Sequence, residues 1–296
     1  MSKFQRTFKL TVQGKSGNTY VISDPLTVIF DVNRRAYGSL NTGHFMVYNL
    51  GAAARGDIQY DNAIDAEARP FQFQAGYISE GYKPILFKGT LQRALSYRDG
   101  PNIVTEMQVL DGGEAVQKAQ IERTRNYPWD PATEIRQIIS LMNPHGVTVG
   151  ALGSIVQNMR ATRGVTWIGS VWDVLCKVAA AKGGYACIDL QKVYIMAQND
   201  ALAIPGAIPQ LDASTGLIGT PRRSGWILDA EMIFEPRVQL MQALKVVSSV
   251  NPNINGTYAV QAISHRGIIS QAKDGGVVTA MSLQTLPETM NLVVPE

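Results

Sequence analysis

Histidine is the residue type best suited to acid–base chemistry or metal binding, and this 296-residue chain has three: His44, His145 and His265. His265 follows Ser264, and a serine beside a histidine suggests a nucleophile and its base. Because successive side chains of a strand point to opposite faces, adjacent residues cannot form that pair. The sequence contains no HExxH or GxSxG motif and no phosphate-binding glycine loop. We therefore predict no catalytic residue and no metal ligand.

Three aspartates, Asp57, Asp61 and Asp65, recur at helical spacing and could share one helix face. A glycosidase would need two carboxylates across a cleft, one of them in an apolar pocket. We interpret the aspartates instead as the solvated face of a short surface helix. The two cysteines, Cys176 and Cys187, form no CxxC motif, which indicates folding in a reducing cytosol and predicts no metal or cofactor site.

The charge of the chain is nearly balanced, with 27 Lys and Arg against 24 Asp and Glu. Basic pairs such as Arg34-Arg35 and Arg222-Arg223 are too short for a phosphate-binding stripe, and we interpret them as solvated strand ends and loops. Charged residues make up 17%, below the usual quarter or so, which suits a surface covered by partners but also occurs in β-rich monomers. No run approaches the length of a membrane span, so we expect no stable membrane insertion.

The first third of the chain alternates between β-rich segments and turn residues. A clear hairpin turn is Asp99-Gly100-Pro101, and a short helix is expected just after Gly51. Several strands with a single helix favour a small barrel or a sandwich. The expected strands are FKLTV (8–12), TYVI (19–22), LTVIFDV (26–32), HFMVYNL (44–50), PFQFQAGY (70–77), ILFKGTLQRALSYR (85–98) and NIVTEMQVLD (102–111).

The middle of the chain changes to helical periodicity. A helix is predicted over 130–142, because Asp130 can cap it, a proline follows and isoleucines then recur on one face. A second helix is predicted over 166–184, where the apolar stripe includes Ile168. A hairpin should follow, YACIDL and then VYIMAQ, with its turn near Gln191-Lys192. These segments together predict a small α/β domain.

Strand patterns return after a loop-rich stretch over 201–225. The last ten residues, 287–296, have no clear partner strand. Two interpretations of this end stay open: an arm that reaches a neighbouring subunit or a spike protein, and a disordered tail.

The last third repeats a pattern of the first third. If the two parts are related, His265 occupies the place of Tyr97, and tyrosine cannot replace a catalytic base. We therefore interpret His265 as the amphipathic end of a barrel strand, with its ring packed and one nitrogen hydrogen-bonded. The matching segments are ALSYR (94–98) with AISHR (262–266), and VTEM (104–107) with VTAM (278–281).

Three stretches of the chain carry a resemblance to a known family. The first is a strand that ends in Tyr-Asn-Leu before a short helix, the second an F-x-G strand with a hairpin and an Asp-Gly exit, and the third a closing G-x-Y strand that leads to a histidine. Their residues are Tyr48, Asn49, Leu50, Phe87, Gly89, Asp111, Gly112, Gly256, Tyr258 and His265. In this set the chain resembles the baseplate hub proteins of contractile-tailed bacteriophages, and it is similar to the spike-base proteins of type VI secretion systems.

The resemblance implies a mainly β protein with a smaller α/β region, in which two tube-like β-barrels flank an inserted α/β domain. The expected domains are a first barrel over 1–112, an α/β domain over 113–212, and a second barrel with a C-terminal arm over 213–296. The ten motif residues are expected to have structural roles.

The resemblance also implies a non-enzymatic function. The expected protein is a homotrimer that adapts the sixfold tail tube to the threefold central spike and forms part of the DNA channel. Its expected partners are the tail tube or a tube-initiator protein, the spike, baseplate wedge proteins, the tape measure protein and, transiently, DNA. It would act in the virion baseplate after assembly in the host cytoplasm. Two alternatives stay open: a tail-associated cell-wall hydrolase, and a hexameric distal-tail or tube-like protein.

Overall fold

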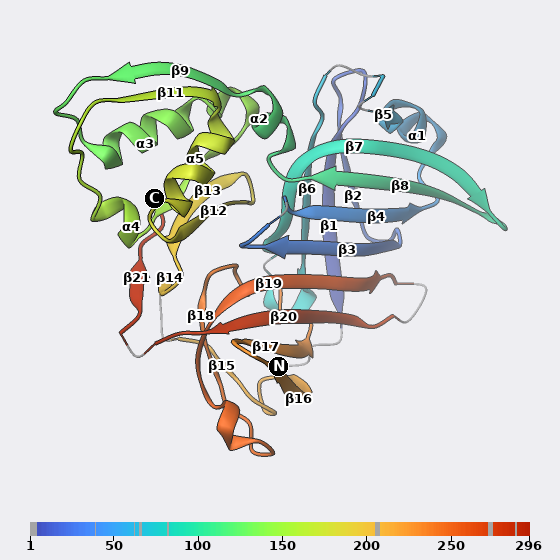
Figure 1. Cartoon of the computed structure of the whole chain (residues 1–296). Helices are drawn as coiled ribbons and strands as arrows, with labels where there is room; N and C mark the ends of the chain where they lie inside the picture. The colour runs from blue at the N-terminus through green and yellow to red at the C-terminus, as the bar shows by residue number, and fades with distance from the viewer. Residues whose placement is uncertain are drawn as a thin grey trace.

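The computed structural model describes residues 5–38, 40–61, 63–64, 67–81, 83–204, 208–271, 275–287 and 289–296. It confirms a mainly β protein with a smaller α/β region (Figure 1). The elements of the first third are β1 (Arg6–Gln13), β2 (Thr19–Ser23), β3 (Val28–Arg35), β4 (Thr42–Tyr48), α1 (Ala52–Ile58), β5 (Tyr60–Asp61), β6 (Pro70–Tyr77), β7 (Ile85–Asp99) and β8 (Asn102–Leu110).

The middle of the chain holds most of the helices. Its elements are α2 (Gly113–Lys118), β9 (Gln120–Arg125), α3 (Pro131–Ser140), β10 (Thr148–Leu152), α4 (Ser154–Gln157), β11 (Val165–Ser170), α5 (Val171–Ala180), β12 (Gly184–Asp189), β13 (Lys192–Ala197) and β14 (Asp200–Leu202). The last third is again made of strands. They are β15 (Gln210–Leu211), β16 (Leu217–Ser224), β17 (Ile227–Ile233), β18 (Ala243–Val246), β19 (Gly256–Ile269), β20 (Val277–Thr285) and β21 (Asn291–Val293).

Fourteen strands join into one sheet, and eight of them form its broad central part. In Figure 1 these eight follow one another down the view in the order β7, β8, β4, β3, β19, β20, β17 and β16. The first and last thirds meet where β3 pairs antiparallel with β19, in a register that runs from Arg35–Ala262 to Val28–Ile269. The two strand-rich ends of the sequence are therefore parts of one continuous sheet.

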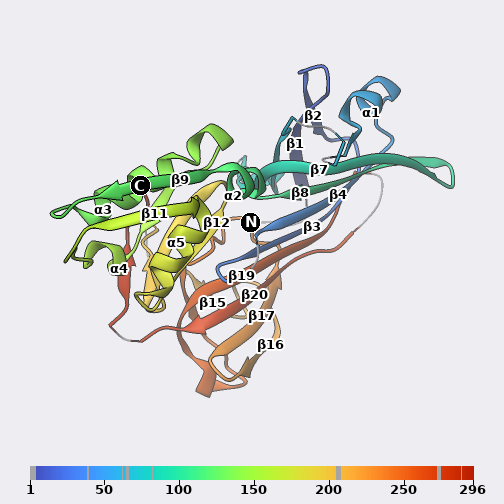
Figure 2. The same ribbon diagram turned by 45° about the horizontal axis from the view of Figure 1, so that its top comes forward.

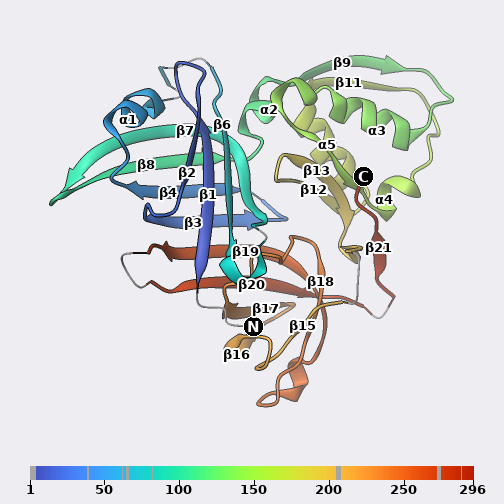
Figure 3. The same cartoon turned by 180° about the vertical axis from the view of Figure 1, so that it is seen from behind.

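The first core lies inside the curl of this sheet. Seen from behind, β1 and β6 cross the back of β3 and β4 (Figure 3). The ring of Phe73 on β6 lies 5.0 Å from that of Phe30 on β3 and 4.9 Å from that of Phe45 on β4, centroid to centroid. Because β3 and β6 are not neighbours in the sheet, these contacts require it to fold over. Burial of each such ring stabilises the fold by roughly 1.5–3 kcal/mol.

Two further cores lie beside the first. One lies beneath β17, β19 and β20 and includes Leu228 and Met281. The other includes Ile138 and lies between the helices and the three-stranded sheet β10-β13-β12, which α5 covers (Figure 2). The Sγ atom of buried Cys187, on β12, lies 3.7 Å from the Sδ atom of Met241, so the α/β region packs on the last third. The predicted domain boundaries stay predictions.

Both helices predicted for the middle of the chain are present, but the second is shorter than predicted. Asp130 caps α3, as predicted, by accepting the Thr133 N–H at 2.8 Å. The helix α5 begins at Val171, after the Ser170 cap, and the residues before it form β11. Ile168, assigned to the helical stripe, is 69% exposed on this strand. That assignment was wrong because the β-branched segment pairs with the distant β9, and tertiary pairing overrides a helical pattern.

The hairpin β12–β13 is confirmed, with Leu190 and Gln191 at positive φ in its turn. The last ten residues have a partner strand that the sequence did not reveal. The short strand β21 runs parallel to β14, and the carboxylate of Glu296 pairs with Arg136 of α3 at 2.6 Å. The C-terminal arm is therefore docked on the α/β region of its own chain, where Figure 1 places the C-terminus.

Candidate functional site

The eight central strands present one uncovered face, whereas β1, β2 and β6 cross their back (Figures 1 and 3). We call this side the open face, because no other described part of the chain covers it. Its residues alternate along each strand with core residues: on β3, Asp31 and Arg35 are exposed, while Val32 and Arg34 are buried. The strand register places corresponding residues of neighbouring strands in rows across this face. A surface this broad is the candidate functional site.

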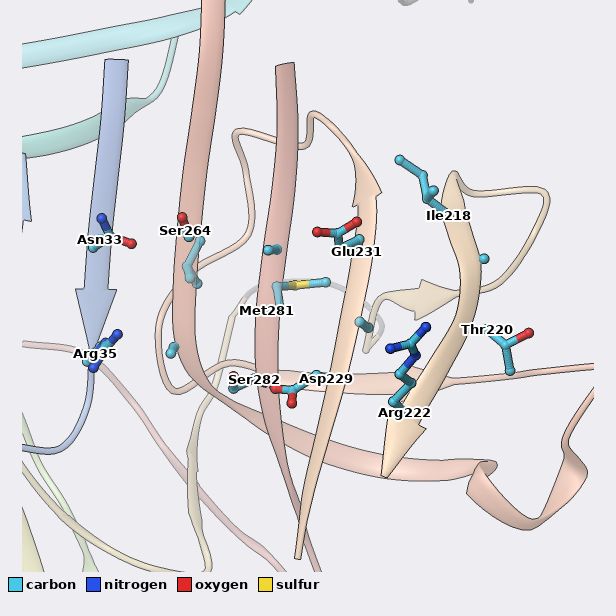
Figure 4. Close-up of a pocket in the computed structure, with 15 residues that line it drawn as sticks. Asn33, Arg35, Ile218, Thr220, Arg222, Asp229, Glu231, Ser264, Met281 and Ser282 are labelled. Carbon is cyan, nitrogen blue, oxygen red and sulfur yellow. Dashed lines mark hydrogen bonds between the residues drawn. The ribbon is translucent and has the colours of Figure 1, made fainter. Parts of the chain in front are cut away.

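Polar side chains line a hollow of about 670 Å³ where the open face approaches the α/β region. One row across it comprises Arg35, Ser282, Asp229 and Arg222, from β3, β20, β17 and β16 (Figure 4). The hydroxyl of Ser282 donates to Asp229 Oδ1 at 2.7 Å. A second hollow of about 300 Å³ continues across β3, β4 and β8 and shares Asn33 with the first. The hollows form one extended surface across the strands.

Charges of both signs occupy the open face. Arg266 donates to Glu231 at 3.2 Å, and His44 lies 2.9 Å from Glu106, whose pKa this hydrogen bond holds below its ordinary value. DNA phosphates bind strongly to cations that have no acidic neighbours. A face on which positive and negative charges balance therefore attracts DNA only weakly. The cross-strand rows contain four arginines and four carboxylates: Arg35, Arg93, Arg222, Arg266, Asp31, Glu106, Asp229 and Glu231.

A free strand edge lies at each side of the open face. In the described part of the chain, β16 pairs only with β17, and residues 95–99 of β7 pair only with β8. Each edge therefore carries backbone groups that a further strand can bind. The edge of β16 is partly blunted, because Pro221 lacks an N–H and the register is irregular between Ile218 and Arg222.

The family described as Baseplate hub gp41 matches residues 7–273. This chain belongs to the baseplate hub family. The resemblance inferred from the sequence is confirmed, and the family places the hub among the structural proteins of the phage tail baseplate. No curated protein matches the sequence of the hub significantly.

Solved structures of tail proteins share the fold of the hub. The 43 kDa tail protein of prophage MuSo2 from Shewanella oneidensis aligns with a TM-score of 0.60 and 11% identity, over 94% of the hub and 98% of that chain. The tail protein from Neisseria meningitidis MC58 gives a TM-score of 0.60 and 10% identity, over 94% and 96%. A chain of a Francisella PdpA-VgrG complex gives 0.57 and 7%, over 97% of the hub and 59% of that chain. At these identities the likeness shows the fold alone.

The first sequence motif of the hub turns the chain from β4 into α1. Asn49 has a φ of 57°, its Oδ1 accepts the Ile103 N–H at 3.0 Å, and its own N–H donates to Ile103 O at 2.7 Å. The side chain thus extends the β4–β8 ladder where the backbone turns away. Leu50 is buried in the first core, and Tyr48 is half-buried on the open face.

The second motif brings two strands close together. Phe87 is buried in the first core, with its ring 6.2 Å from that of Phe45. A Cβ atom added at Gly89 would lie 2.4 Å from the carbonyl oxygen of Leu110 on β8. No side chain fits between β7 and β8 at this point, so the glycine is required by packing.

Asp111 and Gly112 end the second motif and join the first third to the α/β region. Asp111 Oδ1 accepts the Gln191 N–H at 2.9 Å in the β12–β13 turn, and Gly112, at a φ of 67°, leads into α2. The carboxyl group is fully buried, and its Oδ2 has no hydrogen-bond partner among the described residues. Burial, and then the charge of Asp189, raise the pKa of Asp111 to about 8. Asp111 is therefore largely protonated at neutral pH.

A buried ion pair beside Asp111 escaped the sequence analysis. Arg34 Nε and Nη2 donate to the two carboxylate oxygens of Asp189 at 2.8 and 2.6 Å, and Asn41 Nδ2 donates to Asp189 Oδ1 at 2.9 Å. The interpretation of Arg34-Arg35 as a solvated strand end was therefore wrong for Arg34. Strand parity is the signal that could have placed Arg34 inside, because Val28, Phe30 and Val32 precede it at alternate positions.

The third motif begins at the start of β19. Tyr258 is buried, and its hydroxyl donates to the carbonyl of Ile254 at 2.6 Å, which closes the turn before the strand. Gly256 pairs with Val246 of β18. A Cβ atom there would meet only the Tyr258 ring, at 3.7 Å, so nothing in the described packing requires this glycine.

His265 is fully buried between β3 and β20. Its Nδ1 lies 2.9 Å from Thr279 Oγ1, and its ring meets that of Phe234 edge-on at 5.8 Å. Burial, and then the charge of Arg34, lower its pKa to about 3, so the ring is neutral at neutral pH. The predicted packed ring with one bonded nitrogen is confirmed, but it lies within the strand and not at its exit. A ring with no exposed surface cannot reach a substrate.

The internal repeat is offset by one residue from the predicted alignment. Ser96 pairs with Thr105 across β7–β8, whereas His265 pairs with Thr279 across β19–β20. With the two threonines equivalent, His265 corresponds to Ser96, and the match to Tyr97 was wrong. Tyr97 is 41% exposed, on the opposite side of its strand. The register shifts upstream give the same offset: they lie between Leu91 and Arg93 and between Val260 and Ala262, and aligning them places Ser96 on His265.

The remaining candidates for chemistry lie apart. His145 faces Glu114 at 3.4 Å on the α/β region. The predicted helix ends before Asp61, the side chain of Asp57 holds the turn between β1 and β2, and Asp65 lies outside the described residues. Within the described ranges, no cluster of His, Cys, Asp or Glu could hold a metal ion. No helix there is both long and apolar enough to cross a membrane.

Proposed function

We propose that the protein is the hub of a contractile tail baseplate, a homotrimer that joins the sixfold tail tube to the threefold central spike. The observation that carries the proposal is the continuous central sheet, which contains two similar hairpin units and ends in a free edge on each side. Two related units per copy let three copies present six similar surfaces to a sixfold partner.

The free edges supply the contacts between copies. In this arrangement β16 of one copy lies against residues 95–99 of β7 in the next copy, so that three open faces line a common channel. Such pairing would use the backbone groups of β16 and of residues 95–99 that face no further strand among the described residues, and it would cover edges that otherwise promote aggregation.

The charges of the open face suit a channel for DNA. Arginines and carboxylates alternate across the rows, and Arg266 and His44 have acidic partners on the same face. A strongly basic wall would hold the genome, whereas a balanced wall lets it pass. DNA contact is therefore transient.

The other proposed partners follow from this position in the tail. They are the tail tube or a tube-initiator protein, the central spike, baseplate wedge proteins and the tape measure protein, with assembly in the host cytoplasm. A hexameric tube-like protein would need one hairpin unit per chain, whereas this chain has two. A hydrolase is not favoured, because His265 is buried and His44 and His145 lie on different parts of the fold.

Sedimentation of an edge variant tests the trimer and its contact. Ser96→Lys places a charge on the free edge of β7. Thr166→Lys, on the exposed strand β11, is the matched control. We expect the wild type and Thr166→Lys to sediment as trimers and Ser96→Lys to associate at least about tenfold more weakly. An unchanged Ser96→Lys trimer would rule out this edge contact, and a wild-type hexamer would rule out the trimer.

A further inference from the structure

A buried polar joint attaches the α/β region to the central sheet. Its residues come from the end of β3, the start of β4 and the exit of β8 on one side, and from the turn between β12 and β13 on the other. Across this joint Asn41 Nδ2 donates to the carbonyl oxygen of Ile188 at 3.0 Å. All members of the set are buried. We call the set the turn joint: Arg34, Asn41, Asp111, Asp189 and Gln191.

The turn joint contains two carboxyl groups and one guanidinium. The guanidinium of Arg34 is engaged by Asp189, because its Nε and Nη2 donate to the two carboxylate oxygens at 2.8 and 2.6 Å. Asp111 accepts a backbone N–H of the turn, that of Gln191 at 2.9 Å, and its Oδ2 has no hydrogen-bond partner among the described residues. A buried carboxylate without a cation of its own is strongly disfavoured. The packing of the joint therefore requires Asp111 to hold a proton.

Three further titratable groups interact with the charges of the turn joint. Two of them are Cys187 of β12 and Tyr194 of β13, and burial raises the pKa of both above their ordinary values. The third is His265 of β19, whose pKa burial lowers to about 3. The pKa of Asp111 is about 8. Of these four groups, Asp111 is therefore the one that changes its charge near neutral pH.

We infer that the turn joint is a proton-dependent latch, which is closed while Asp111 is protonated and lets the β12–β13 turn open when Asp111 loses its proton. An ionised Asp111 would face the carboxylate of Asp189 while the guanidinium of the joint is engaged, so it must reach water. The turn is the part that moves, because its Leu190 is already partly exposed, whereas β3 and β8 are each paired on both sides. The latch acts within one chain and does not depend on the proposed trimer.

The direction of the pH dependence follows from the proton on Asp111. The closed joint holds a proton that the open joint, in which the carboxyl group is solvated, has released. Closure is therefore strongest at low pH and weakens as the pH rises towards 8. Each pH unit in this range shifts the equilibrium towards the open joint by at most about tenfold, and the shift ends above about pH 8.

Amide hydrogen exchange on the full chain tests the latch. The readout is the protection of residues 188–192 in the turn, corrected for the effect of pH on the exchange of a free peptide. Residues 262–266 of β19, in the central sheet, report on global unfolding in the same samples. Asp111→Asn mimics the protonated acid. The matched control is Asp99→Asn, which alters an exposed aspartate at the tip of the β7–β8 hairpin.

In the wild type and in Asp99→Asn, we expect the protection of residues 188–192 to fall by at least about tenfold between pH 6 and 8. The protection of residues 262–266 should stay constant, because the sheet does not open. In Asp111→Asn the turn should keep its protection over the whole range, since no proton can be lost.

A second variant tests the charge balance of the joint without altering Asp111. Asp189→Asn frees the guanidinium of Arg34 for Asp111, which can then ionise in the closed joint, so the fall between pH 6 and 8 should disappear. Wild-type protection of the turn that does not change with pH would overturn the inference. An equal fall in residues 262–266, or a fall that either substitution in the joint leaves in place, would overturn it as well.

Discussion

Asp111 couples the stability of the hub to pH. Its pKa rises on folding from 3.8 to about 8, so between these values the folded state holds a proton that the unfolded state has released. The contribution of Asp111 to stability is therefore full below about pH 4 and falls as pH rises towards 8, by at most about 1.4 kcal/mol per pH unit. Asp111→Asn, which mimics the neutral acid, should remove this fall. Denaturant unfolding from pH 5 to 9 checks it, and parallel curves for both proteins would contradict it.

His265 acts in the opposite direction. Its pKa falls on folding from 6.5 to about 3, so the unfolded state binds a proton that the folded state excludes. The resulting stability is present above about pH 6.5 and is lost as pH falls towards 3. We expect His265→Gln to give a folded trimer with a flatter acid limb. Unfolding curves from pH 4 to 7 test this expectation, which a variant as acid-sensitive as the wild type would refute.

The sequence predicted the surroundings of some residues and not those of others. The packed ring of His265 was predicted because the adjacent Ser264 points to the opposite face of the strand and no partner for acid–base chemistry was indicated. The residue of the first third that corresponds to His265 could not be predicted, because it depends on which residues lie opposite each other in two pairs of strands. The buried Arg34–Asp189 pair joins residues far apart in the chain, and neither side chain signals the other locally.

The close approach of β7 and β8 leaves no room for a larger residue at Gly89. Gly89→Ala would place a Cβ atom 2.4 Å from the carbonyl of Leu110, and we expect a loss of about 1–3 kcal/mol of unfolding free energy. Gly56 in α1 has open space around its Cβ position and is the control, with an expected gain of about 0.5–1 kcal/mol for Gly56→Ala. Thermal unfolding compares the two. Equal stability of both variants would mean that the strands can separate without cost.

Helices and strands could be predicted from the sequence where the residues that determine them lie within or beside the element itself. The start of α3 was predictable because Asp130 and Pro131 act on their own helix. The strand β11 was not, because its partner β9 lies about forty residues earlier. The arm strand β21 likewise pairs with β14 across a long separation. The join of β3 to β19, which merges the two halves, has no local signature at all.

The balance of charges on the open face determines how strongly the protein binds DNA. We expect the purified hub to form no tight complex with duplex DNA at physiological salt, because its arginines share the face with carboxylates. Asp229→Asn/Glu231→Gln removes two of these carboxylates and should raise nonspecific affinity several-fold, with a steeper salt dependence. Fluorescence anisotropy across a salt series measures both proteins. A nanomolar, salt-sensitive complex of the wild type would contradict the account.

The central claim is that three copies of this chain, each with two similar hairpin units, surround the tail axis. Image reconstruction of the assembled tail without imposed symmetry measures it directly. The account predicts three copies of the chain in one ring, with β16 of each beside β7 of the next and the open faces towards the axis. Six copies in the ring, or open faces turned away from the axis, would contradict it.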